Sequence, residues 1–425
     1  MRQTYEVKEP FSDKCLLVTV SLYEDRQKGW LPEDSSAEFE ELVLSSGAKI
    51  LGHIIVRLDE PTANFFLGKG KIEEIHAMVE MLGKGIDSVI LSENLSSTQQ
   101  RNMEQVLGVK VIDRTQLILD IFSQRAHTNE GKLQVELARL EYMLPRLAGL
   151  GIKLSRLGGG IGTRGPGEKM LETDRRGIMR KIKYVKSELF KLSKRRKKLR
   201  QNRMEHSVAT VAVIGYTNAG KSTLINKLTG SDTFCDSRLF STLDLTARRL
   251  VLPNNQKILL VDTVGFIHKL PHDLIEAFKA TLEEVREADL LLHVLDISSP
   301  KAGEHMEAVL GVLKEIDSYH KPVVTALNKI DLVRDNFDAG RFHRNIEDSV
   351  IISAKEGISL KTLIDMIKSR ITMLVEKVDI LITHDKMGLL SSIYEQGRVL
   401  ERKDTPEGIR IKAIVPSHLK SRLKA

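Results

Sequence analysis

The chain has 425 residues, of which 41% are hydrophobic and 29% charged, a composition typical of a globular protein with about two to four domains. No apolar run is long enough to span a membrane, the N-terminal residues lack the apolar core of a signal peptide, and two cysteines are too few for a disulfide framework. We therefore expect a cytoplasmic protein without stable membrane insertion, and we expect it to be a monomer.

Residues 1–128 are predicted to form an N-terminal α/β subdomain. Strand-like stretches such as KCLLVTVSL and KILGHIIVRL alternate with helix-like stretches such as GKIEEIHAMVEMLG and STQQRNMEQVLG. This βαβα order predicts a mostly parallel sheet that is covered by helices.

Residues 129–206 are predicted to form an antiparallel helical coiled-coil hairpin. Apolar residues recur at heptad spacing from Leu133 to Leu147 and again from Ile178 to Leu199. Pro145 is expected to kink the first helix. The link between the helices contains GGGIGTRGPGE, Gly158–Glu168, whose glycines and proline exclude a helix or strand interior. We expect this loop at the tip of the hairpin.

The positive charge is concentrated in the second helix of that hairpin. The chain carries a net charge of +8, and Arg175–Arg203 holds fourteen Lys or Arg and one Glu. That segment alone carries +13, so the remaining residues sum to −5. Such a localised cationic stripe indicates a polyanionic partner, and RNA fits it best. An anionic membrane would require a broader apolar face.

Residues 207–372 are predicted to form a P-loop nucleotide-binding domain. GYTNAGKS follows the apolar strand VAVIG and precedes a helix, which is the context that a phosphate-binding loop requires. Glycines let backbone N–H groups surround phosphates, a lysine meets their charge, and a hydroxyl ligates Mg²⁺. The expected phosphate-contacting residues are Gly215, Asn218, Ala219, Gly220, Lys221, Ser222 and Thr223.

Three later stretches favour a guanine nucleotide, GTP or GDP. DTVG places Asp262 near Mg²⁺ and Gly265 at the γ-phosphate. NKID contributes Asn328, Lys329 and Asp331, and a carboxylate at Asp331 can accept both guanine donors. SAK contributes Ser353, Ala354 and Lys355, whose amides can meet the guanine O6. With these stretches in order, the domain resembles translation-factor-like GTPases.

The catalytic residues of this site are expected to be Lys221, Thr242, Gly265 and Asn218. Thr242 is the preferred switch ligand of Mg²⁺ and the γ-phosphate, with Thr246 as the alternative. The position after Gly265, where many GTPases carry a glutamine, is Phe266. We therefore expect slow intrinsic hydrolysis that a partner stimulates. Asn218 resembles the asparagine by which potassium-activated GTPases help to hold K⁺.

The N-terminal half narrows the family. FFLGKGKIEEI, GGGIGTRGPGEKMLETDRR and DTVGFIHKLPHDLIEAFKATLEE closely resemble signature stretches of the HflX family. The resemblance covers roughly residues 14–370 and implies a GTPase that binds the large ribosomal subunit and splits or rescues stalled ribosomes under stress. It implies rRNA contacts through the Gly158–Glu168 loop and the Arg175–Arg203 helix, and a partly ribosome-bound location. Lys169 and Met170 stand where family members commonly have Thr-Gln, and the additional positive charge would suit an RNA surface.

Several alternatives remain open at this stage. The protein can instead be a nucleotide-gated factor that silences ribosomes or acts in their assembly without splitting them, or a membrane-linked signalling GTPase. The family is also linked to ATP hydrolysis through the N-terminal half, for which Gly68–Lys71 is the candidate, although it lacks the full phosphate-loop pattern. Residues 373–425 are expected to form a small α+β domain of unassigned role.

Overall fold

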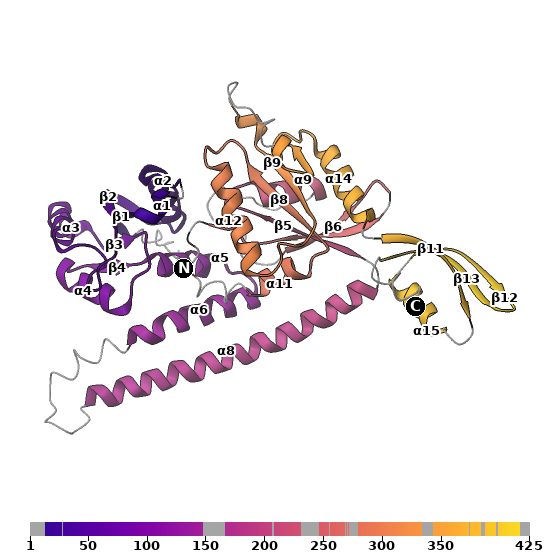
Figure 1. The fold of residues 1–425 in the computed structure, drawn as a ribbon. Coiled ribbons are helices and arrows are strands. Elements are labelled where there is room, and N and C mark those ends of the chain that lie inside the picture. Colours follow the sequence, from indigo (N-terminus) through magenta and orange to yellow (C-terminus); the bar gives the residue numbers. More distant parts are fainter. Residues whose placement is uncertain are drawn as a thin grey trace, which may run out of the picture. The chain divides into compact units, whose positions relative to one another are not determined.

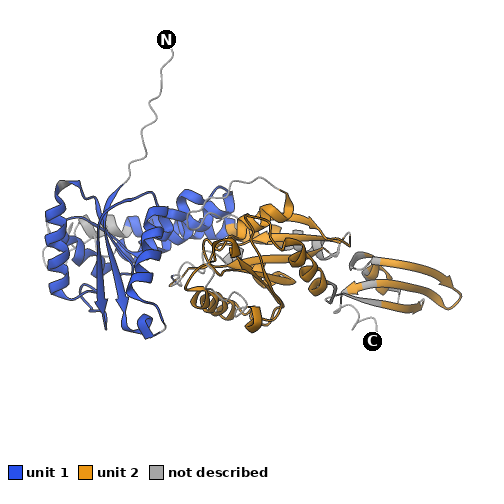
Figure 2. Ribbon diagram, turned by 90° about the horizontal axis from the view of Figure 1, so that it is seen from above, with its two compact units in different colours: residues 1–188, 271–277 blue, residues 189–270, 278–425 orange. Residues whose placement is uncertain are grey.

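The computed structural model describes residues 13–27, 29–147, 166–205, 208–230, 246–254, 256–267, 269, 271, 279–333, 343–373, 375–383, 387–396 and 398–416. The chain divides into two compact units, Met1–Glu188 with Pro271–Ala277, and Leu189–Leu270 with Phe278–Ala425 (Figure 2). None of the helices in these ranges is both long enough and apolar enough to cross a membrane.

The first unit contains a four-stranded parallel sheet in the order β2-β1-β3-β4 (Figure 1). Its strands are β1 (Lys14–Leu22), β2 (Lys49–Leu58), β3 (Ser88–Leu91) and β4 (Lys110–Ile112). The helices are α1 (Tyr23–Gln27), α2 (Pro32–Ser45), α3 (Lys69–Leu82), η1 (Gly83–Gly85), α4 (Ser97–Leu107) and α5 (Arg114–Arg125). Contacts pair α2 with α5 and α3 with α4. The predicted βαβα order is confirmed.

Alternating side chains explain how this sheet is covered. Leu16, Val18 and Val20 of β1 pack in one cluster with Ile75 of α3 and Met103 of α4. Local signals fix the helix starts, because Ser96 and Gln99 form a capping box at α4. The carboxyl ends of β3 and β4 are thereby held beside the starts of α4 and α5.

A helical hairpin follows, made of α6 (Asn129–Leu147) and α8 (Pro166–Glu205), which run side by side in opposite directions (Figure 1). Ion pairs join the two helices, with 2.6 Å between Lys181 Nζ and Glu136 Oε1 and 2.7 Å between Lys186 Nζ and Glu141 Oε1. Val185 is buried, and the heptad leucines of α6 are half-buried except for Leu140, which is buried. The seam is therefore a narrow one, as two helices alone would make.

One prediction about the hairpin loop is wrong in part. Most of Gly158–Glu168 lies outside the described residues, but Pro166, Gly167 and Glu168 belong to the first turn of α8. Proline is favoured at a first helical position, where its fixed φ suits the helix and no N–H is needed. Pro145 lies near the C-terminal end of α6, which continues to Leu147.

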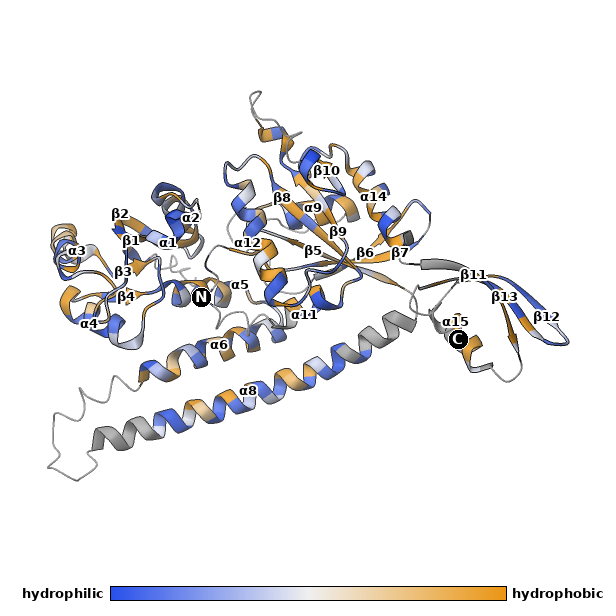
Figure 3. Ribbon diagram, viewed as in Figure 1, coloured by the Kyte–Doolittle hydropathy of each residue, from blue (hydrophilic) through white to orange (hydrophobic). Residues whose placement is uncertain are grey.

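The second unit contains a six-stranded sheet in the order β10-β9-β8-β5-β7-β6, with β6 antiparallel to its neighbour β7. The strands are β5 (Ala209–Gly215), β6 (Thr246–Val251), β7 (Lys257–Asp262), β8 (Leu290–Asp296), β9 (Val323–Asn328) and β10 (Ser349–Ile351). The helices are α9 (Lys221–Thr229), α11 (Lys279–Glu287), α12 (Ala302–Glu315), η2 (Ile330–Leu332) and α14 (Leu360–Met373). The central strands are hydrophobic, whereas much of α8 is hydrophilic (Figure 3).

The C-terminal part of that unit is a small antiparallel sheet in the order β11-β13-β12. It consists of β11 (Val375–Thr383), α15 (Met387–Gln396), β12 (Arg398–Thr405) and β13 (Gly408–Pro416). Ile393 of α15 packs against Ile382 and Ile411 of the sheet. The predicted α+β character of this part is confirmed.

Candidate functional site

The loop between β5 and α9 has the backbone geometry that its glycines predict. Gly215 and Gly220 have φ angles of 151° and 94°, and Asn218 has a φ of 58°. A Cβ at Gly215 would lie 2.3 Å from Val294 O, and one at Gly220 would lie 2.3 Å from Asn328 Nδ2. Both positions therefore require glycine. The loop leads directly into the N-terminus of α9, where backbone N–H groups face an incoming anion.

Lys221 lies folded against this loop. It is 6% exposed, and its Nζ donates to Gly215 O at 3.1 Å and to Tyr216 O at 2.8 Å. Burial lowers the pKa of the ammonium to about 8, and the nearby Asp262 carboxylate partly offsets that shift. A buried cation of this kind gains most from an anion placed in the loop.

Ser222 and Asp262 meet at the edge of the sheet. Ser222 Oγ donates to Asp262 Oδ2 at 2.9 Å, and Asp262 is 3% exposed at the end of β7. A hydroxyl and a carboxylate are the hard oxygen ligands that Mg²⁺ prefers, so this pair fits that ion. Gly265 is close by, since a Cβ there would lie 2.9 Å from Lys221 Nζ.

Asn328 connects two loops of the site. It is 2% exposed at the end of β9, its Nδ2 donates to Ala219 O at 2.8 Å, and its Oδ1 accepts from Ala354 N at 2.9 Å. The Ala354 amide is therefore engaged by Asn328. Neither bond could be predicted from the motifs, because each joins residues far apart in the sequence.

The other residues of these two loops lie at the same edge. Lys329 has a left-handed φ of 67° and its Nζ lies 2.7 Å from Asp296 Oδ2. Asp331 is exposed in η2. Ser353 is buried, and its Oγ accepts from the backbone N–H of Glu356 at 3.0 Å. Lys355 is exposed.

The remaining predicted residues of the site differ in their exposure. Asn218 is exposed, Ala219 is buried and Thr223 is half-buried. Thr242 lies outside the described residues, whereas Thr246 is exposed at the first position of β6. Phe266 is 3% exposed, and its main chain is bonded to the phosphate loop through Gly215 O and Thr217 N at 3.1 and 2.7 Å.

Two histidines behind the loop were not predicted. His293 of β8 is buried, and its pKa is lowered to about 4 by burial and by the charge of Lys221. His305 of α12 stacks on Tyr216, with ring centroids 3.9 Å apart and planes at 12°. Burial likewise lowers the pKa of His305 to about 4. Both rings are therefore neutral at physiological pH, and His305 supports the loop through its stack on Tyr216.

The basic helix α8 presents its charge to solvent in the described part of the hairpin. Exposed residues at helical spacing line its outer face, namely Arg176, Arg180, Lys183, Lys191, Lys194, Arg195 and Lys198. Tyr184 and Phe190 are also exposed on this helix. Further along, Arg196 Nη2 lies 3.3 Å from Glu283 Oε2 of α11.

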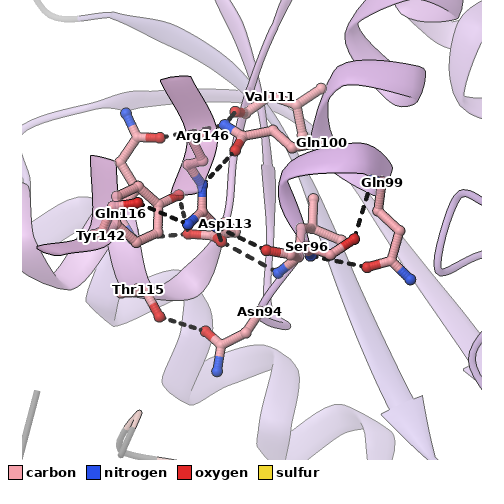
Figure 4. A network of polar contacts seen from close by, with 11 residues as sticks. Asn94, Ser96, Gln99, Gln100, Val111, Asp113, Thr115, Gln116, Tyr142 and Arg146 are labelled. Atoms are coloured by element: carbon pink, nitrogen blue, oxygen red, sulfur yellow. Dashed lines mark hydrogen bonds and ion pairs between the residues drawn. The ribbon is translucent and has the colours of Figure 1, made fainter. Parts of the chain in front are cut away.

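A polar network joins α6 to the carboxyl edge of the first unit's sheet (Figure 4). Asp113 is fully buried, caps α5, and accepts from Tyr142 Oη at 2.9 Å and from Arg146 Nη2 at 2.9 Å. Arg146 Nη2 also donates to Leu95 O at 2.7 Å. The network fixes the last turn of α6, which leads into the Gly-rich link. Gly68–Lys71, the candidate ATP segment, forms the start of α3, where Lys71 pairs with Glu74 at 2.6 Å.

Four family descriptions match the chain in order. They are "GTP-binding GTPase N-terminal" at residues 33–123, "GTP-binding GTPase Middle Region" at 125–203, "50S ribosome-binding GTPase" at 210–329 and "HflX C-terminal domain" at 342–416. A solved structure titled "crystal structure of SsGBP and GDP complex" is 28% identical, with a TM-score of 0.46, and the match covers 85% of this chain and 99% of that one.

Curated relatives match over most of their length. The chain is 47% identical to "GTPase HflX" of Caldanaerobacter subterraneus subsp. tengcongensis, a match that covers 92% of this chain and 90% of the relative. The identity to "GTPase HflX" of Lacrimispora saccharolytica is 43%, over 99% and 97% of the two chains. For the Escherichia coli protein of the same name it is 42%, over 85% and 83%. The chain therefore belongs to the HflX family of GTPases.

Proposed function

We propose that the chain hydrolyses GTP to GDP and phosphate on the large ribosomal subunit and thereby splits or rescues stalled or inactive ribosomes. The observation that carries the nucleotide part is the convergence of separate segments at one sheet edge. Lys221 folds against Gly215 and Tyr216, Ser222 bonds Asp262, and Asn328 bonds Ala219 and Ala354. Polar residues gathered at the carboxyl edge of a parallel sheet support a ligand site there.

In this proposal the phosphates lie against the Gly215–Thr223 segment. Lys221 and the amides of the loop hold them, and Gly265 provides an amide on the γ-phosphate side. Ser222, Asp262 and Thr242 would hold Mg²⁺, which supplies charge neutralisation on the β- and γ-oxygens. Asn218 is exposed in the loop and offers a side-chain oxygen for K⁺.

Base selection is assigned to the two loops that follow β9 and β10. Asp331 accepts the two guanine donors, and Lys329 together with Ser353 and Lys355 borders the base. Asn328 acts through the protein, because both ends of its amide are bonded to backbone groups. This arrangement supports guanine over adenine, since adenine would leave the Asp331 carboxylate unmatched.

Slow hydrolysis without a partner follows from Phe266. Its side chain is packed in the core, so no glutamine-like group follows Gly265 to orient the attacking water. The rate then depends on a partner that completes the site. The description "50S ribosome-binding GTPase" of the matched family supports the large subunit as that partner.

The RNA contact is assigned to α8 and the Gly158–Glu168 segment. Exposed basic residues on α8 can neutralise phosphates of rRNA, which releases counterions and makes binding weaken steeply with salt. The double variant Lys183→Glu/Lys198→Glu should lower the affinity for large subunits and reduce the salt dependence. The control Lys314→Glu/Lys361→Glu reverses two exposed charges of α12 and α14 and should bind as the wild type does.

Sedimentation of intact ribosomes tests the splitting activity. Ribosomes are incubated with the protein and either GTP or a non-hydrolysable analogue and are then run on a sucrose gradient. Release of free subunits supports the proposal. Stable co-sedimentation with whole ribosomes would support the second candidate, a nucleotide-gated silencing factor, which the same basic helix favours.

A further inference from the structure

We propose that the Thr217 hydroxyl is a further catalytic group of this site and donates a hydrogen bond to the γ-phosphoryl group of GTP. The inference rests on the proposed function, in which the phosphates lie in the Gly215–Ser222 loop. Thr217 occupies the third position of that loop. The phosphate-loop pattern fixes only the glycine, lysine and serine positions, and Thr217 occupies one of the variable positions. The motif alone therefore does not assign it a role.

The burial of Thr217 is the first observation. The residue is 7% exposed, and its Oγ1 is buried with no hydrogen-bond partner among the described residues. Neighbouring hydroxyls are satisfied within the protein, because Thr263 Oγ1 donates to Val213 O at 2.7 Å and Ser222 Oγ donates to Asp262 at 2.9 Å. A buried hydroxyl without a protein partner calls for a functional explanation.

The position of the side chain is the second observation. A Cβ built on Gly265 would lie 2.9 Å from Thr217 Cγ2 and 2.9 Å from Lys221 Nζ. Thr217 thus borders Gly265 with its methyl group, at the place where the Lys221 ammonium also approaches that glycine, and both Lys221 and Gly265 are assigned to the terminal phosphate. When GTP binds, the anionic γ-phosphate oxygens reach this place, and they can accept a hydrogen bond.

The main chain holds Thr217 in this place. Thr217 N donates to Phe266 O at 2.7 Å, and Phe266 N donates to Gly215 O at 3.1 Å. These two bonds lock the loop to the segment that follows β7. The Phe266 side chain is buried in the core, so Thr217 supplies a polar side chain on a wall where Phe266 supplies none.

The step itself needs no proton from Thr217. Water adds to the γ-phosphorus, the bond to the β–γ bridging oxygen breaks, and GDP and inorganic phosphate leave. A donor on a γ-phosphate oxygen stabilises the charge of the transferring group and fixes its orientation. GDP lacks this group, so the contact distinguishes GTP from GDP.

Isosteric substitution tests the proposal. Thr217→Val removes the hydroxyl and keeps the shape, whereas Thr217→Ser keeps the hydroxyl. GDP and a non-hydrolysable GTP analogue are titrated by calorimetry, and hydrolysis is measured with saturating large subunits. Thr217→Val should bind GDP within about twofold of wild type, bind the analogue about tenfold more weakly, and turn over about tenfold more slowly, as expected for loss of one hydrogen bond to a charged group. Thr217→Ser should restore both.

Two results would overturn the inference. Thr217→Val could bind the analogue and hydrolyse GTP as the wild type does, or it could lose GDP and analogue affinity equally, which would show a merely structural role. Wild-type protein that binds neither nucleotide would instead refute the proposed function of the loop. The two failures are therefore distinguishable.

Discussion

Asn328→Ala should both destabilise the second unit and weaken nucleotide binding. The substitution leaves the buried carbonyl of Ala219 and the buried amide of Ala354 without their partner, which lies at 2.8 and 2.9 Å in the wild type. Each unsatisfied buried group costs about 1–3 kcal/mol, so the free energy of unfolding should fall by about 2–6 kcal/mol. That is a large part of the 5–15 kcal/mol that is typical of a folded protein.

Gly220→Ala provides a partner variant for a double-mutant cycle. The new Cβ would lie 2.3 Å from Asn328 Nδ2, and the φ of 94° adds strain. In the Asn328→Ala background the clash disappears and only the strain remains, so the two effects should not add. Asn254→Ala, on an exposed loop, is the control and should change little.

Urea unfolding followed by far-UV circular dichroism and GDP titration by calorimetry measure these effects. The expected result is a lower midpoint for the unfolding of the second unit and at least tenfold weaker GDP binding by Asn328→Ala. A loss of less than about 1 kcal/mol with unchanged GDP affinity would refute the view that Asn328 holds the two loops together.

Further predictions concern base selection, pH and the hairpin. Asp331→Asn should weaken the preference for GTP over ATP in competition binding, and an unchanged preference would contradict the role of Asp331. Burial lowers the pKa of His293 from 6.5 to about 4 in the folded protein. The free energy of unfolding of the second unit should therefore be highest above pH 6.5 and fall by roughly 3 kcal/mol as the pH is lowered to 4, because the unfolded chain binds the proton more readily. His293→Leu should remove that share of the pH dependence of urea midpoints. Arg146→Met should lower the free energy of unfolding of the first unit by about 3 kcal/mol, because it strips the buried Asp113 carboxylate of its cation. Fluorescence of the single tryptophan, Trp30, which is buried in that unit, reports this change, and an unaltered transition would contradict it.

Some segments could be predicted because their signals, a regular apolar pattern or glycines at fixed positions, lie within the segment itself. KCLLVTVSL and KILGHIIVRL form β1 and β2 over the predicted residues. The continuous apolar run of β1 suits a strand buried on both faces, whereas the edge strand β2 buries Ile54 and Val56 and exposes Ile55. The strand–loop–helix at Gly215 was predictable for the same reason, with glycines where φ is positive. The fold class needed little beyond these patterns.

Other features arise from contacts that no local pattern encodes. No local pattern predicts β12, because RVLERKDT is mostly charged and becomes a strand by pairing with β13. The heptads of α6 predicted the seam with α8 but not the opposite face, where Tyr142 reaches Asp113 at 2.9 Å. Three features became visible only when distant strands met at one edge. They are the Thr217 hydroxyl, which has no hydrogen-bond partner in the described part of the chain, the bonds of Asn328, and the His305–Tyr216 stack.

GTP hydrolysis by the wild-type protein with and without purified large ribosomal subunits tests the central claim most directly. The proposed function predicts slow hydrolysis by the protein alone and at least tenfold stimulation by large subunits, with the stimulation lost as salt is raised. Full-rate hydrolysis by the protein alone, or a rate that large subunits leave unchanged, would contradict it.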